Sequence, residues 1–178
     1  MLIRALVCGG IGLARLLELV YSRRNLRSYP DAIPGPWSRR TYPLIVLVHV
    51  IDFGGTFVFG SDRPRRLFLA LLLAVQPLRA WVLLTLGRRW NTLAAVPADM
   101  ELATNGPYAF VRHPNYSVVL VELAMVPAAF GLRRLAIAGP LAMALILALR
   151  IPEEEAMLAR LPGHERLAAK PRFIPFLF

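Results

Sequence analysis

Residues 106–116, GPYAFVRHPNY, gather prolines and hydrogen-bonding side chains between two strongly apolar stretches. The His113-Pro114 pair restricts His113 to extended geometry and places a proline in the first turn of the following helix. Free backbone N–H groups at that helix start, with Arg112 and His113 beside them, would suit an anion such as a carboxylate. The simpler interpretation is a helix start with interfacial tyrosines and a snorkelling arginine.

A second group of charges lies in RIPEEEAML, residues 150–158. We expect Pro152 to end one helix and to open another. The first turn of the new helix would carry Glu153, Glu154 and Glu155, where the helix dipole favours negative charge. Three adjacent carboxylates would also suit a ligand that bears a cationic or hydroxyl group. The residues alone leave both interpretations open.

Charged residues also fall inside apolar stretches, where a charge is costly and normally faces a partner or a polar cavity. They are Arg15, Glu18, Asp52, Arg79 and Glu122. Arg15 and Glu18 stand at i and i+3, so they are expected to neutralise each other. Glu122 has no partner nearby in the sequence, which makes it the strongest functional candidate of the group. His49 and Asp52 share a helical face, but two ligands do not complete a metal site, and none is predicted.

Five apolar segments approach the length of about 20 residues that a helix needs to cross a bilayer. The predicted spans are 2–21, 43–60, 66–87, 116–132 and 134–151. The 57% hydrophobic content and mean hydropathy of +0.53 exceed those of an ordinary soluble domain. The sequence therefore predicts an all-α, polytopic membrane protein of one domain, with three spans in 1–87 and two in 88–178.

The basic residues gather at the ends of the apolar segments, as membrane topology requires. They do not form the single stripe of a nucleic-acid-binding face, so nucleic acid is not an expected partner. Twelve lie in the 1–2 connection, the 3–4 connection and the tail, against six on the opposite side. The positive-inside rule therefore predicts that the 3–4 connection and the C-terminus lie in the cytoplasm. Cys8 is the single cysteine, which excludes an intrachain disulfide.

Three stretches together, GPYAFVRHPNY, RIPEEEAML and the terminal PRFIP, resemble the isoprenylcysteine carboxyl methyltransferase family of membrane enzymes. That family has a Gly-Pro-Tyr, an Arg-His-Pro-x-Tyr at the start of a span, and an Arg-x-x-x-Glu-Glu after the last span. In this chain the order and spacing match over roughly residues 81–178. The stretches ARLLELVYSRRN and GRRWNT are similar to bacterial members that accompany polyketide-type biosynthesis.

The resemblance implies S-adenosylmethionine-dependent methyl transfer, with the cofactor held between the 3–4 connection and the C-terminal segment. The cofactor-binding residues it implies are Tyr108, Arg112, His113, Asn115, Tyr116, Arg150, Glu154 and Glu155. The cationic side chains of this set would bind the cofactor carboxylate. The glutamates would bind its ammonium or ribose hydroxyls, and the tyrosines would pack on adenine or bind ribose.

A carboxylate acceptor needs no base, whereas a phenol or enol needs deprotonation, for which His113 or Glu122 is the catalytic candidate. Glu18, Trp90 and Asn91 are expected on the substrate side. The implied acceptor is a lipophilic molecule that enters from the bilayer of a bacterial inner membrane. Candidates are an alkylpyrone, a long-chain phenol or an isoprenylcysteine-like compound, and the oligomeric state is left open.

The chain departs from the family pattern at Val118, where a glycine is common, and at His164 and Leu167, near places that usually hold tyrosines. These departures concern the acceptor more than the cofactor. One alternative is an NADPH-dependent membrane reductase of the sterol-reductase type, which shares a related helical arrangement and a similar Asn-Tyr motif. A phospholipid N-methyltransferase and a non-catalytic membrane scaffold are the others.

Overall fold

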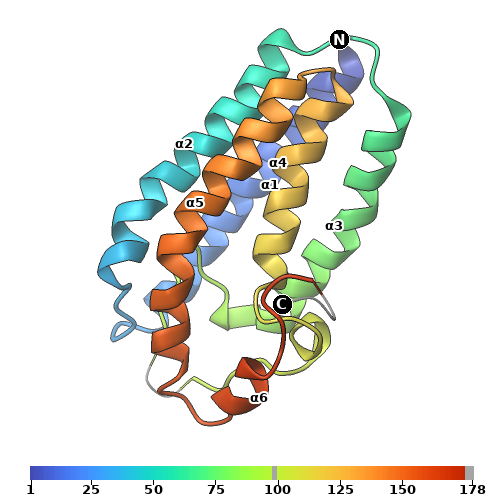
Figure 1. The fold of residues 1–178 in the computed structure, drawn as a ribbon. Helices are drawn as coiled ribbons and strands as arrows, with labels where there is room; N and C mark the ends of the chain where they lie inside the picture. Colours follow the sequence, from blue (N-terminus) through green and yellow to red (C-terminus); the bar gives the residue numbers. More distant parts are fainter. Residues whose placement is uncertain (98–99, 175–178) are drawn as a thin grey trace.

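Helices alone form the secondary structure of the described residues, 1–97 and 100–174, in this computed structural model. Five long helices run along one another (Figure 1): α1 (Leu2–Arg27), α2 (Pro36–Phe59), α3 (Arg66–Leu86), α4 (Pro114–Ala129) and α5 (Arg133–Leu158). Short turns of helix follow at η1 (Gly87–Arg89), η2 (Gly106–Ala109) and α6 (His164–Ala168). The all-α prediction is confirmed for this part of the chain.

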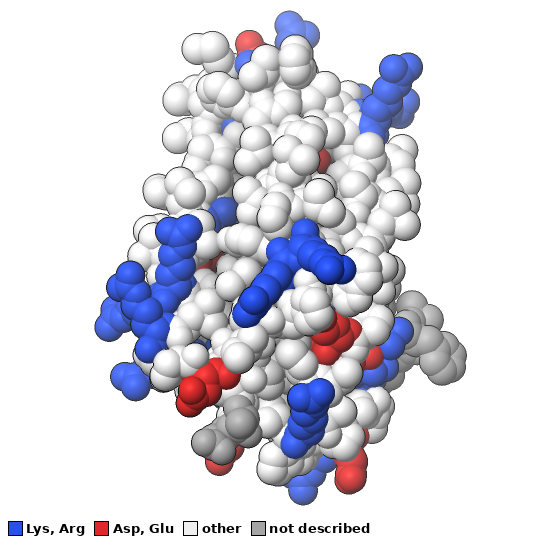
Figure 2. Space-filling model, turned by 90° about the vertical axis from the view of Figure 1, so that its left-hand side faces the viewer, with Lys and Arg blue, Asp and Glu red and all other residues white. Residues whose placement is uncertain are grey.

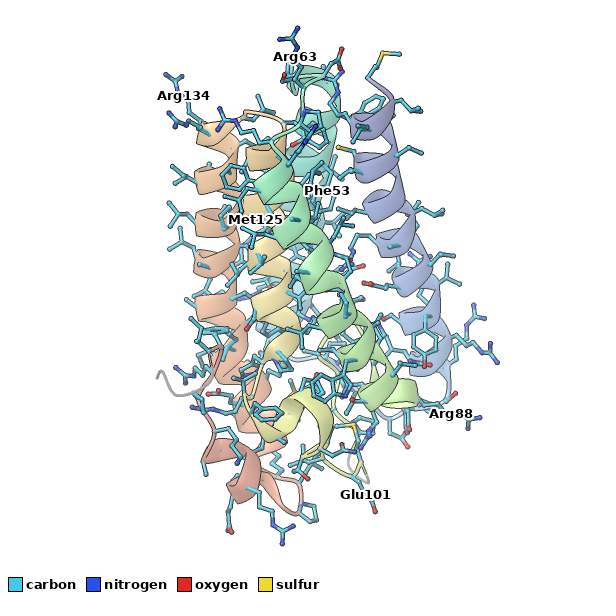
Figure 3. The ribbon with its side chains drawn as sticks, turned by 90° about the vertical axis from the view of Figure 1, so that its right-hand side faces the viewer. Phe53, Arg63, Arg88, Glu101, Met125 and Arg134 are labelled. Atoms are coloured by element: carbon cyan, nitrogen blue, oxygen red, sulfur yellow. The ribbon has the colours of Figure 1, made fainter. Side chains whose placement is uncertain are left out.

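The connections between the helices fall at two opposite ends of the bundle (Figure 1). The N-terminus and the α2–α3 and α4–α5 connections share one end, where Arg63 and Arg134 lie (Figure 3). The α1–α2 connection, the segment between α3 and α4, and α6 share the other end, where Arg88 and Glu101 lie. We call this second end the loop end. It brings together the two segments that the sequence proposes for the cofactor.

Three helices are long and apolar enough to cross a membrane: Pro36–Phe59, Arg66–Arg89 and Arg133–Leu158. Helix α4 is apolar but shorter, at 16 residues, and α1 carries Arg15 and Glu18 near its middle. Figure 2 shows a broad, largely uncharged belt between charged groups toward the two ends. The protein is therefore an integral membrane protein, with three of the five predicted spans supported by length and composition.

Three helices extend beyond their predicted apolar spans. Helix α1 continues to Arg27, past the predicted end at residue 21. Helix α2 begins at Pro36, about two turns before the predicted start, and Glu153 accepts hydrogen bonds from the backbone N–H groups of Trp37 and Ser38 there. Helix α5 continues through Pro152 to Leu158. The prediction that Pro152 opens a new helix was wrong, because a membrane helix tolerates an internal proline whose freed backbone groups find other partners. The three glutamates thus lie in the last turns of α5.

The apolar core lies between α2, α3, α4 and α5. Its buried members include Phe53, Leu72, Val119, Leu123, Val126, Met143 and Leu147. Phe53 and Met125 are labelled in Figure 3, and the partly buried Met125 packs against the same core. Gly139 of α5 passes so close to α2 that a Cβ there would overlap the carboxylate of Asp52. Close packing of these four helices fixes the positions of the helix ends that carry the segments at the loop end.

Candidate functional site

Side chains of α1 fix the beginning of the segment between α3 and α4. Asn25 donates to the carbonyl oxygens of Gly87 and Trp90, at 3.1 and 2.8 Å. Ser22 accepts a hydrogen bond from the backbone N–H of Thr92 at 2.9 Å. The Trp90 carbonyl oxygen and the Thr92 N–H gain a partner from these bonds, whereas the Gly87 carbonyl oxygen also accepts from the backbone N–H of Trp90. The loop is therefore held in place by residues more than sixty positions earlier in the chain.

Asn91 and Gly106 set the shape of the rest of this segment. The Asn91 side chain accepts hydrogen bonds from the backbone N–H groups of Leu93 and Ala95, and donates to the carbonyl oxygen of Ala95. Gly106 has φ +57°, and a Cβ there would overlap the side chain of Thr85. Only glycine fits such a position without strain. Asn91 thus orders the loop, in addition to any contact with a substrate.

The C-terminal segment pairs with the start of α4. The backbone N–H groups of Arg112 and His113 donate to the carbonyl oxygens of Pro171 and Arg172, at 2.8 and 2.9 Å. The Ser117 hydroxyl donates to the carbonyl oxygen of Phe173 at 2.8 Å. Two motifs that are distant in the sequence therefore lie side by side. Pro175, the last residue of the PRFIP motif, lies outside the described residues.

Glu155 is the centre of a cluster of charged side chains at this junction. Its Oε1 accepts hydrogen bonds from Arg112 Nη1 at 3.0 Å, His113 Nε2 at 3.1 Å and Arg172 Nε at 3.1 Å. Its Oε2 accepts a fourth, from Arg172 Nη2 at 2.7 Å, and these bonds raise the pKa of Arg172. We call these four residues the outer cluster. Arg112 and His113, expected at the cofactor carboxylate, already bind a carboxylate of the protein.

Glu154 belongs to a separate network. The Tyr116 hydroxyl donates to Glu154 Oε2 and accepts a hydrogen bond from Arg150 Nε at 3.1 Å. Arg150 Nη2 donates to the carbonyl oxygen of Thr92 at 2.6 Å, while the buried Nη1 has no partner among the described residues. The three consecutive glutamates therefore have three different roles. Glu153 caps α2, Glu154 binds Tyr116, and Glu155 holds the outer cluster.

A second ionic cluster lies inside the bundle. Arg79 of α3 donates from Nε to Glu18 Oε1 at 2.9 Å and from Nη2 to Glu18 Oε2, while its Nη1 donates to Asn115 Oδ1 at 2.9 Å. The expected i, i+3 pair of Arg15 with Glu18 is confirmed at 3.0 Å. Asn115, expected at the cofactor, is thus bound to Arg79. The guanidinium of Arg79 also lies over the Trp90 ring, 5.6 Å from its centroid.

Glu122 completes this inner cluster. It is fully buried, its Oε1 accepts a hydrogen bond from Gln76 at 3.1 Å, and Arg15 Nη2 lies 3.6 Å from the same oxygen. Its partners come from α1 and α3, so the absence of a partner nearby in the sequence did not mean isolation. Gln76 was missed by sequence reasoning, although a polar residue within an apolar stretch was a usable signal. The inner cluster consists of Arg15, Glu18, Gln76, Arg79, Asn115 and Glu122.

A cavity of about 480 Å³ joins the loop end to the interior of the bundle. At the loop end its lining includes Trp90, Asn91, Tyr108, Arg112, His113, Tyr116, Arg150 and Glu154. Deeper in the bundle it includes Arg15, Glu18, Ile45, His49, Phe53, Val119, Met143 and Leu147. Glu122 and Glu155 are not part of the lining. The structure therefore brings most of the expected site residues to the lining of one cavity, and two of them, Glu122 and Glu155, do not line it.

Tyr108 contributes a hydroxyl to the polar end of the cavity. Its burial raises the pKa of the phenol above the ordinary value, and the nearby Glu154 carboxylate raises it further. The hydroxyl therefore stays protonated and can donate a hydrogen bond.

No metal centre is found among residues 1–97 and 100–174, where no three His, Cys, Asp or Glu side chains are placed to hold an ion. His49 and Asp52, for which the sequence predicted a shared helical face but no metal site, have separate surroundings. His49 Nδ1 is bonded to the carbonyl oxygen of Ile45 at 2.7 Å, and both carboxylate oxygens of Asp52 are buried without a partner in the described structure.

The fold and the site define an integral membrane protein in which one cavity connects a polar end to an apolar interior. The chain belongs to the isoprenylcysteine carboxyl methyltransferase (ICMT) family, whose sequence model matches residues 68–160. The matched region runs from the first turn of α3 to just beyond α5 and contains Tyr108, Arg150 and the three glutamates. Helices α1 and α2 lie outside it.

The chain is also similar to a bacterial protein. The chain is 31% identical over 119 residues to "Uncharacterized protein YpbQ" of Bacillus subtilis (strain 168). The similarity covers 64% of this chain and 71% of the relative. The resemblance inferred from the motifs is confirmed, and the protein is a member of a family of membrane methyltransferases.

Proposed function

We propose that this protein transfers a methyl group from S-adenosylmethionine to an oxygen of a lipophilic acceptor in the membrane. The observation that supports this most is the cavity, which is polar at the loop end and mostly apolar within the bundle, where Arg15 and Glu18 are its charged lining residues. Its volume falls in the range of about 300–1,000 Å³ typical of small-molecule sites. A polar cofactor and a lipophilic acceptor would meet where the two parts join.

The groups at the polar end fit the chemistry of the proposed cofactor, which has an ammonium, a carboxylate and ribose hydroxyls. Glu154 uses Oε2 for Tyr116, and its other oxygen would accept from the ammonium or a ribose hydroxyl. Arg112 uses Nη1 for Glu155, and its Nη2 would bind the carboxylate. The protonated Tyr108 hydroxyl would donate to the ribose or adenine. S-adenosylmethionine, when bound, supplies a methyl group that its sulfonium makes electrophilic.

Glu155 has a different role in this proposal from the one its motif suggested. It does not line the cavity, and its carboxylate holds Arg112, His113 and Arg172 together. We therefore infer that Glu155 is a positioning residue and that Glu154 touches the cofactor. Fixing cationic side chains before a ligand binds reduces the entropy lost on binding.

Exposed apolar residues at the cavity support a lipophilic acceptor. Leu16 of α1 and Val46 and Val50 of α2 line the cavity and also have exposed side chains. In a membrane these side chains face lipid, so an acceptor would pass between α1 and α2. The apolar walls would exclude water from the reacting groups. The positive-inside bias supports a cytoplasmic position for the polar end, where a water-soluble cofactor is available.

The two candidate bases are not equally well placed. His113 lines the cavity, although its Nε2 is bonded to Glu155. Glu122 does not line it, so the cavity gives no support to Glu122 as a base, and in this proposal Glu122 positions Arg15. A carboxylate acceptor would require neither residue as a base.

Calorimetric binding to the detergent-purified full chain tests the proposal, with S-adenosylmethionine, S-adenosylhomocysteine and NADPH as ligands. We expect saturable binding of the first two, weakened about tenfold in Glu154→Gln because a neutral amide replaces the charged carboxylate that would bind the ammonium or ribose. The same change at exposed Glu165 of α6 is the matched control and should have no effect. Binding of NADPH alone would identify a reductase, and binding of none of the three would favour a scaffold.

A further inference from the structure

His49 of α2 brings an imidazole into the apolar part of the cavity. Its ring lines the cavity near Ile45 and Phe53 and meets the Phe53 ring edge to face, with centroids 5.5 Å apart. Met143 and Leu147 of α5 line the same cavity and carry no charge. A polar ring in such surroundings is costly unless its nitrogen atoms have hydrogen-bond partners.

One of the two ring nitrogens has a partner. His49 Nδ1 lies 2.7 Å from the carbonyl oxygen of Ile45, and a carbonyl oxygen can only accept, so Nδ1 carries the hydrogen. A neutral imidazole then has an unprotonated Nε2, which can only accept a hydrogen bond. The apolar walls favour this neutral form over an imidazolium. Nε2 makes no hydrogen bond to any described residue.

The carboxylates near this depth offer no free oxygen to the cavity. Glu18 uses both oxygens for Arg79 and one of them also for Arg15. Glu122 Oε2 and both oxygens of Asp52 have no partner among the described residues, but neither residue lines the cavity. His49 Nε2 is therefore an acceptor that this part of the cavity can offer to a bound molecule.

We propose that His49 Nε2 accepts a hydrogen bond from a hydroxyl group of the lipophilic substrate. The substrate class is then an amphiphile with a free hydroxyl, such as a phenol, enol or alcohol, and its ether or hydrocarbon counterpart is discriminated against. His49 acts as a specificity-determining residue. This subsite deepens the proposed function and rests on it for the identity of the cavity, but it lies outside the family-matched residues 68–160.

Equilibrium binding of two probes to the full chain in lipid nanodiscs tests the subsite. Para-dodecylphenol carries the hydroxyl, and para-dodecylanisole has the same shape with a methyl ether that cannot donate. The wild-type protein should prefer the phenol by about three- to tenfold, which corresponds to one net hydrogen bond. His49→Phe should abolish this preference, while the same change at His164 of α6, which does not line the cavity, should keep it.

Further variants separate the lost acceptor from a damaged fold. His49→Gln retains an amide oxygen and should keep part of the preference, whereas His49→Met, a second acceptor-free variant, should lose it. Absence of a preference in the wild-type protein, its persistence in the acceptor-free variants, or its loss in His49→Gln would each overturn the subsite. S-adenosylmethionine binding, measured on the same samples, reports separately on the proposed function, because the two probes need no cofactor.

Discussion

The outer cluster places Arg112, His113 and Arg172 around one partly exposed carboxylate, Glu155, at the loop end of the bundle. The inner cluster instead balances two arginines against the carboxylates of Glu18 and Glu122 inside the apolar bundle. Charge at membrane depth is costly, so the inner cluster has to be neutral. The outer cluster reaches water and keeps an excess of positive charge, which suits an anionic ligand. Similar side chains therefore neutralise one another inside the bundle and, in the proposed function, prepare a binding site at the loop end.

Breaking the inner cluster should have the largest effect on stability. In Glu18→Gln the buried guanidinium of Arg79 loses its counter-charge, and loss of one partner from a buried ion pair costs about 3–5 kcal/mol. Reversible unfolding in mixed detergent measures this change. The double variant Glu18→Gln/Arg79→Gln should recover part of the loss because it restores neutrality.

Arg4→Gln is the matched control for that experiment, since Arg4 lies on the same helix and pairs with the exposed Asp62. It should cost less than Glu18→Gln, because the partner carboxylate of Asp62 is 60% exposed and water screens the pair, although the Arg4 side chain is only 13% exposed. Equal effects of Glu18→Gln and Arg4→Gln would show that the inner cluster is not a buried, neutral unit.

Breaking the outer cluster should have a smaller effect on stability and a local effect on the C-terminal segment. Glu155→Gln removes the charge that holds Arg172 and should cost about 1–2 kcal/mol, after allowance for partial exposure. The segment should then detach more often from the start of α4. Limited trypsin cleavage after Arg172, followed by mass spectrometry, measures this detachment. Unchanged cleavage relative to wild type and to the Glu165→Gln control would contradict the role given to Glu155.

The smallest of these effects is expected at Glu153, although it adjoins the other two glutamates. Glu153→Ala removes the side-chain acceptor for the first N–H groups of α2 and should cost about 1 kcal/mol, as for other helix N-caps. Binding of S-adenosylmethionine should stay the same, in contrast to Glu154→Gln. Calorimetric titration of Glu153→Ala and Glu154→Gln with S-adenosylmethionine distinguishes a helix cap from a ligand-binding carboxylate. Equal losses of affinity in the two variants would contradict the different roles given to Glu153 and Glu154.

The sequence alone was sufficient for the elements that depend on local pattern. Apolar stretches predicted the five long helices, and the i, i+3 spacing predicted the Arg15–Glu18 pair. The GPYAFVRHPNY and PRFIP motifs indicated the family, and the segments that contain them were expected to lie together at the loop end. In each case the information lies within a few neighbouring residues or within a motif. Hydropathy follows the apolar part of a helix, however, so the polar extensions of α1 and α2 were not predicted, and that of α5 was predicted as a separate helix.

Contacts between helices could not be predicted in the same way. The partners of Glu122 are Gln76 and Arg15, on two other helices, and spacing along the chain does not show which helices are neighbours. The different hydrogen-bond partners of Glu153, Glu154 and Glu155 also depend on which segment packs against each side of α5. The unpaired nitrogen of His49 was hidden for the same reason, because its importance comes from the cavity around it.

The most direct test of the central claim is an experimental structure of the full chain with S-adenosylhomocysteine. We predict that the ligand occupies the loop end of the cavity, with its amino-acid or ribose groups bound by Glu154, Arg112 and Tyr108, and that the apolar part beside His49 stays open to an acceptor. A ligand bound away from this cavity, or one that fills the apolar part and leaves Glu154 untouched, would contradict the account.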